Sequence, residues 1–178
     1  MKKQTASNLL NFVFFQGVWF LTVIAAANNS WLPGVIGFIV VLVVHYQLFS
    51  TARADCLLAV CAILVGLIIE TVFVQTELLV YSAKTPLAGV VPVWVLILWA
   101  NFALIMNGCL SWLHGRYILA AILGFLGAPL SYLGGIQLGA AVAGTDLRIV
   151  LLSAAFAYAI VTPCFLYMAQ RLAGSRPE

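Results

Sequence analysis

Residues 56–75 read CLLAVCAILVGLIIETVFVQ and contain one acidic or basic side chain, Glu70. An apolar run of about 20 residues is long enough to cross the ~30 Å hydrocarbon core of a bilayer as an α-helix. Lipid offers the backbone no hydrogen-bond partners, so the segment must satisfy its own polar groups, which favours a helix. A carboxyl group inside such a helix is costly to desolvate, and this makes Glu70 a candidate functional residue.

The rest of the chain has the same character. The 178 residues are 65% hydrophobic and only 7% charged, against about 25% charged in soluble domains. A core of this size cannot hide so much apolar surface, so lipid must cover much of it. We expect one integral membrane domain, residues 1–178, with the all-α fold of a six-transmembrane-helix bundle. Its predicted spans are residues 9–27, 31–50, 56–75, 92–113, 117–143 and 147–169.

The basic residues predict an orientation with both termini in the cytoplasm. With the N-terminus inside, only Lys84 and Arg148 lie outside, and the reverse topology violates the positive-inside tendency. The basic residues then inside are Lys2, Lys3, Arg53, Arg116, Arg171 and Arg176.

Two segments leave alternatives open. The first span resembles a signal peptide in its Lys2-Lys3 start and its small residues at 25–27, but its length and its polar Asn11 and Gln16 favour a retained helix. The connector 76–91 either lies on the membrane surface or folds over the bundle as a lid.

The polar residues of the spans can be ordered by depth, using 1.5 Å of rise per residue. Glu70 and Gln137 lie at comparable depths near the outer side, while Gln16, Asn101 and Tyr132 lie near mid-membrane. These five are candidate ligand-binding or intramembrane polar residues. No Lys or Arg lies in the spans apart from Arg148 at the outer edge of the sixth, so Glu70 has no cationic partner at its depth and must be protonated, hydrogen-bonded to neutral groups or open to outer water. We expect it to face the bundle interior near Gln137.

Two further ionisable residues are given ordinary roles. His45 is expected to be a packed or hydrated histidine near an interface, and Asp55 to belong to the connector 51–55.

The fifth span carries two rows of small residues. Positions four apart share a helix face, so each row offers a groove that lets another helix approach closely. Pro129 predicts a kink or local unwinding near residues 128–135. The first row, from which we expect the tightest packing, is Gly127, Ser131, Gly135, Gly139 and Ala143, and the second is Ala120, Gly124 and Ala128.

Catalytic and cofactor motifs were sought and not found. The sequence has no Walker loop, HExxH helix, GxSxG elbow or Rossmann fingerprint. We therefore expect no cofactor, no metal site and no catalytic residue, and an enzyme is the less favoured reading. The net charge of +3 is too small to indicate nucleic-acid binding.

Residues across the chain together resemble domain-of-unknown-function family 2878, which comprises small bacterial inner-membrane proteins. The resemblance implies a multi-pass location in the bacterial inner membrane. It also implies an acid at Glu70, where the family usually has Asp. The matching residues are Asn11, Gln16, Trp19, Phe20, Pro92, Trp94, Leu98, Trp99, Phe102, Trp112, Leu113, Gly124, Gly127, Pro129, Tyr132, Gly135 and the run 138–140.

Three functions remain open at this point. The chain is a binding or transport subunit for a small amphipathic molecule or lipid, an accessory protein of fatty-acyl lipid modification, or a membrane scaffold without a ligand. The resemblance also implies that genes for fatty-acyl modification lie near those of the family, which is the only hint for the second. The expected partners are the lipid bilayer, an amphipathic ligand or lipid, and a partner membrane protein. A cavity lined by Glu70, Gln137 and Asn101 would favour the first function.

Overall fold

The computed structural model describes residues 2–83 and 89–174. Lys84 and Arg176, two of the residues that carry the predicted orientation, lie outside this part of the chain. The elements are α1 (Lys2–Ala27), α2 (Leu32–Leu48), α3 (Ala52–Gln75), β1 (Leu79–Tyr81), α4 (Val93–Ala103), the 3₁₀ turn η1 (Ser111–Leu113), α5 (Tyr117–Gln137), β2 (Ala141–Ala143) and α6 (Leu147–Gly174).

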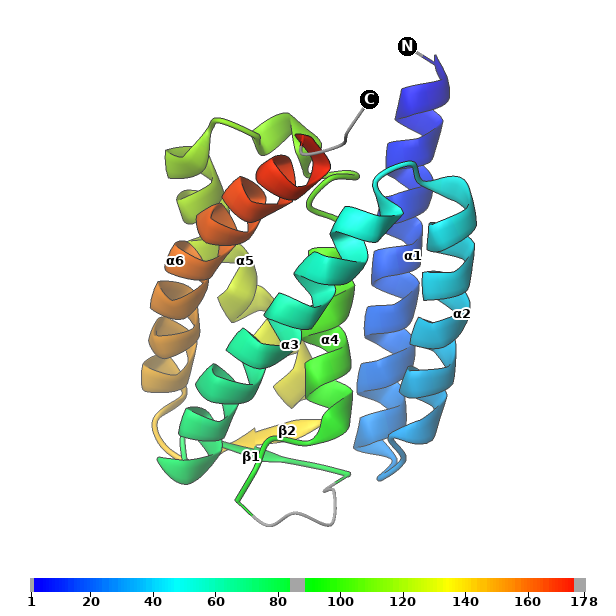
Figure 1. Ribbon diagram of the computed structural model, residues 1–178. Helices are drawn as coiled ribbons and strands as arrows, with labels where there is room; N and C mark the ends of the chain where they lie inside the picture. The colour runs from blue at the N-terminus through cyan, green and yellow to red at the C-terminus, as the bar shows by residue number, and fades with distance from the viewer. Residues whose placement is uncertain (1, 84–88, 175–178) are drawn as a thin grey trace.

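The helices form a bundle and run between two ends (Figure 1). We call one the basic end; it holds Arg53, Arg116 and Arg171, and both termini. The other is the strand end, where β1 and β2 lie. The most extensive helix pair is α5–α6, followed by α3–α4 and α1–α2. Within residues 2–83 and 89–174, four helices, α1, α3, α5 and α6, are long and apolar enough to cross a membrane, whereas α2 and α4 are shorter.

The fourth predicted span is not one helix. α4 ends at Ala103, and residues 104–110 form a series of turns before η1. Asn107-Gly108 is a turn-forming dipeptide within this segment. A Cβ at Gly108 would collide with the side-chain amide of Asn11 on α1, so the glycine leaves room for that amide. The prediction of a continuous helix over 92–113 is therefore wrong, because turn chemistry outweighs the apolar pattern.

The fifth predicted span is also too long. α5 ends at Gln137, and Gly139 adopts a φ of +87°. The Ala140 amide donates to Gly135 O at 2.9 Å and the Gly139 amide to Ile136 O at 3.0 Å. This pair of bonds is the Schellman motif, in which glycine ends a helix. Gly139 is thus a helix stop, and Ala143 belongs to β2.

The described part of the connector 76–91 folds back onto the bundle. β1 pairs antiparallel with β2, with Val80 opposite Val142. Leu79 and Tyr81 are buried, and Trp94 Nε1 at the start of α4 donates to Ser82 O at 3.0 Å. The strands therefore cover the strand end, which agrees with the lid alternative for residues 76–83.

The closely packed small-residue row of α5 is not the one from which we expected the tightest packing. Gly127 and Ser131 are exposed, and a Cβ at Gly127 or Gly135 would meet nothing within 4 Å. A Cβ at Gly124 would instead collide with the backbone carbonyl of Tyr158 on α6. Gly127 and Gly135 of the first row therefore do not make the close contact within the chain that we expected. The buried row is the second, Ala120, Gly124 and Ala128. The helix itself continues through Pro129.

Candidate functional site

Glu70 lies inside the bundle, as expected, and is 1% exposed. Its carboxyl group accepts three hydrogen bonds. Tyr81 Oη donates to Oε2 at 2.5 Å, Trp99 Nε1 donates to Oε1 at 2.9 Å, and Tyr132 Oη also donates to Oε1. These donors offset the cost of burying the carboxyl group. They come from β1, α4 and α5, so Glu70 joins three elements to α3.

Tyr81 is suited to this role because it stays protonated. Burial, followed by the neighbouring Glu70 carboxyl group, raises the pKa of Tyr81 well above its usual value. A tyrosine that keeps its proton remains a hydrogen-bond donor. The strand-end cover is therefore tied to α3 through a tyrosine that keeps its donor proton near neutral pH.

Space for Trp99 is provided by a glycine on α3. A Cβ at Gly66 would collide with the indole ring of Trp99. The ring also packs against Tyr158 and Phe165 of α6, with centroids 4.9 and 6.2 Å away. The indole N–H is in this way directed at Glu70 from a tightly packed position.

The other predicted polar residues do not gather around Glu70. Gln137 is exposed, and it is not among the hydrogen-bond partners of Glu70. Asn101 is buried and donates from Nδ2 to Phe15 O at 3.0 Å. Gln16 is half-buried on α1. Of the five candidates, Glu70 and Tyr132 hydrogen-bond each other, whereas a bond between Gln137 and Glu70 is not among those that the carboxyl group makes.

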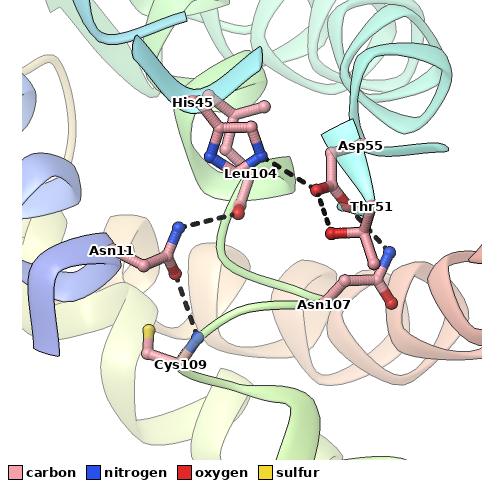
Figure 2. Close-up of polar contacts among 7 residues, drawn as sticks. All are labelled: Asn11, His45, Thr51, Asp55, Leu104, Asn107 and Cys109. Carbon is pink, nitrogen blue, oxygen red and sulfur yellow. Dashed lines mark hydrogen bonds and ion pairs between the residues drawn. The ribbon is translucent and has the colours of Figure 1, made fainter. Parts of the chain in front are cut away.

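A second buried acid lies near the basic end of α3. Asp55 is 0% exposed and His45 on α2 is 1% exposed. His45 Nε2 lies 2.9 Å from Asp55 Oδ2, which also accepts from Thr51 Oγ1 at 2.7 Å. Asn107 Nδ2 donates to Asp55 Oδ1 at 2.8 Å. Figure 2 shows these side chains converging on the carboxylate from three different parts of the chain.

Asn11 binds the same non-helical segment from the other side. Its Nδ2 donates to Leu104 O at 3.1 Å, and its Oδ1 accepts from the Cys109 amide at 3.0 Å (Figure 2). His114 Nε2 bonds Met106 O at 3.1 Å. Backbone groups that a continuous helix would satisfy internally are satisfied here by side chains. Such backbone is tolerated at membrane depth where protein buries it.

Sequence reasoning missed this cluster because Asp55 was assigned to a connector and His45 to packing. Two signals were present. Both residues flank a short connection between helices, which places them side by side in an antiparallel pair. Asn107-Gly108 marked a turn inside an apolar run. Within the part of the chain that the structure describes, no three His, Cys, Asp or Glu side chains form a group that could hold a metal ion.

The fold and these two clusters define a helical protein of the membrane class, with buried acids at both ends of a central apolar helix. The chain belongs to the family described as protein of unknown function (DUF2878), whose model matches residues 8–164. No curated protein and no solved structure matches the chain.

Proposed function

We propose that this protein is a binding or transport subunit for a small amphipathic molecule, and that segment 104–110 is its mobile element. The observation that carries the proposal is the interruption of an apolar helix by backbone that polar side chains hold in place. Interrupted helices are a recurring feature of transporters, where they form substrate and ion sites.

In this proposal Asp55 is the residue that holds segment 104–110 against α3, and we call it the latch. Its carboxylate binds Asn107 of the segment through one oxygen, and His45 and Thr51 through the other. The Asn107 bond can break while His45 and Thr51 still satisfy the carboxylate. The segment can therefore leave α3 without leaving Asp55 unpaired.

The character of the ligand follows from the interior of α3. Between the two acids its buried residues are Leu58, Ala59, Ala62 and Gly66. A molecule that enters here meets polar groups at the basic end and apolar or small side chains beyond. A ligand with an apolar body and one polar end would match these surroundings.

We also propose that the basic end faces the cytoplasm of a bacterial inner membrane, and that the chain crosses six times. The positive-inside tendency supports the first point. The six crossings are supported by the paths of two shorter segments, α2 and α4 with residues 104–113. Both run between the same two ends of the bundle as the longer helices (Figure 1).

A second candidate function is supported by Glu70. All three of its partners are neutral groups held by packing. This arrangement favours an assembly or scaffold role at the strand end, where no ligand is needed.

Labelling of Cys109, a native thiol in segment 104–110, tests the main proposal. The protein, in nanodiscs, keeps only this cysteine, with Cys56, Cys61 and Cys164 replaced by alanine. We expect Asn107→Ala to raise the rate of labelling by a water-soluble maleimide about fivefold, the effect of losing a hydrogen bond of ~1 kcal/mol. The matched control is Asn28→Ala, which removes an exposed asparagine bonded to Ile24 O.

Native mass spectrometry of the gently purified protein then searches for the ligand. We expect a co-purifying amphipathic molecule in the wild type and its loss in Asn107→Ala. Unchanged Cys109 labelling together with no bound molecule would favour the scaffold role.

A further inference from the structure

A pocket of about 640 Å³ opens at the basic end between the start of α5 and the end of α6. Its volume lies within the range of small-molecule sites. It is separate from the Asp55 and Glu70 clusters and shares no residue with them. The residues that line it are Tyr117, Tyr167, Gln170, Arg171 and Gly174.

The polar lining of the pocket is rich in donors. The guanidinium of Arg171 lies over the ring of Tyr167, 5.1 Å from its centroid. Tyr117 Oη donates to Gln170 Oε1 at 3.0 Å, which leaves the Gln170 Nε2 group as a further donor. The rings of Tyr117 and Tyr167 meet edge to face at 6.1 Å. Two phenol rings thus form the wall beside a fixed positive charge.

No described carboxylate neutralises this charge. Among residues 2–83 and 89–174, the ion pair within 4 Å is that of His45 and Asp55. Glu70 is engaged with its three donors, and Glu77 and Asp146 belong to the strand end. The pocket therefore offers a cation and an amide donor without an acidic partner, which is the chemistry of an anion site.

An apolar surface continues from the pocket along α6. Ile160 and Phe156 lie seven and eleven residues before Tyr167, so they share its helix face. They are 68% and 62% exposed. On α5, Ile118 beside Tyr117 is 81% exposed. An anionic group in the pocket can in this way carry an apolar chain that lies against both helices.

We propose that this pocket binds the phosphate headgroup of an anionic phospholipid, with Arg171 as the charged contact and the two tyrosines as the wall. Arginine favours phosphate because its planar fork can donate two parallel hydrogen bonds. Basic pockets between transmembrane helices at the cytoplasmic side bind anionic headgroups in other membrane proteins. The lipid site is independent of the latch at Asp55.

Native mass spectrometry in detergent measures the preference directly. The probes are dioleoyl phosphatidylglycerol and dioleoyl phosphatidylcholine, which share acyl chains and a phosphate but differ in net charge. For the wild type we expect about tenfold tighter binding of phosphatidylglycerol, in the range of a charge-assisted hydrogen bond. Arg171→Gln should abolish this preference and Arg171→Lys should retain part of it, because lysine keeps the charge without the fork.

The matched control is Arg53→Gln. Arg53 lies at the same end beside a tyrosine, with Nε 3.5 Å from Tyr46 Oη, but outside the pocket. The Arg53→Gln variant should leave the preference for phosphatidylglycerol unchanged. If Arg171→Gln melts like the wild type and keeps the full preference for phosphatidylglycerol, the proposal is overturned. An equal loss of this preference in Arg53→Gln would also overturn it. Displacement of phosphatidylglycerol by millimolar inorganic phosphate would instead assign the pocket to free phosphate. Cys109 labelling is scored separately, so failure of one proposal is distinguishable from failure of the other.

Discussion

Asp55 and Glu70 lie on the same buried face of α3, fifteen residues apart, and the carboxyl group of each has three hydrogen-bond partners. Fifteen residues of helix correspond to about 22 Å of rise, most of a bilayer core. Each acid also holds a non-helical segment against the bundle. Asp55 binds Asn107 near the basic end, and Glu70 binds Tyr81 of β1 at the strand end. A single helix therefore carries the attachment points of both irregular segments.

The first prediction concerns the donors around Glu70. Glu70→Gln keeps one oxygen for Trp99 and Tyr132, and its amide can donate to Tyr81 after the hydroxyl rotates. We expect a loss of about 1 kcal/mol in the free energy of unfolding. Glu70→Leu leaves three buried donors unpaired at about 1–3 kcal/mol each, so we expect it to be several times more damaging.

Denaturant unfolding in detergent measures both variants. The matched control is Glu77→Gln, an exposed glutamate at the strand end, which should change stability by less than about 0.5 kcal/mol. A Glu70→Leu variant as stable as the wild type would show that the three hydrogen bonds contribute nothing net.

The second prediction separates the two small-residue rows of α5. A side chain at Gly124 collides with the backbone of α6, which cannot move aside locally, whereas one at Gly127 enters open space. We expect Gly124→Leu to lower the stability of the fold by about 1–3 kcal/mol or more, and Gly127→Leu to have little effect. Thermal unfolding in nanodiscs measures the difference. Equal destabilisation by both would mean that Gly127 also packs against a surface, such as a partner protein.

The apolar pattern was sufficient to predict that these segments are helices. The position of Glu70 inside the bundle followed from the high cost of exposing a carboxyl group to lipid. The apolar pattern did not predict where two of the helices end. Those ends depend on Asn107-Gly108 and on the left-handed conformation of Gly139, which are local turn features inside apolar runs.

The partners of the acids were harder to predict from the sequence. Tyr81 belongs to a connector, and its contact with Glu70 depends on a strand pairing between segments about 60 residues apart. Gln137 matched Glu70 in estimated depth, but depth does not fix the direction in which a helix face points. Helix rotation, set by packing such as Gly124 against Tyr158, decides which polar residues meet.

The third prediction is the orientation of the bundle. A reporter that is active only in the cytoplasm, fused after Gly174, should be active, and the same reporter inserted after Ser82 should be silent. The reason is the concentration of arginine at the basic end. A periplasmic reporter at the same two positions is the control and should give the reverse pattern. Periplasmic activity at Gly174 would contradict the proposed topology.

The fourth prediction is a pH dependence of segment 104–110. Burial lowers the pKa of His114 below its usual value of 6.5, while its Nε2 bonds Met106 O. The closed segment therefore favours the neutral imidazole, and an opened segment takes up a proton more readily. The stability that His114 contributes is fully present above about pH 6.5 and is lost as the pH falls through the lowered pKa.

Hydrogen exchange of residues 104–116, corrected for the intrinsic pH dependence of exchange, should accelerate on acidification. His114→Gln keeps a donor for Met106 O but does not titrate, so it should remove the acceleration. If the acceleration persists in His114→Gln, the titrating group lies elsewhere and the prediction is wrong.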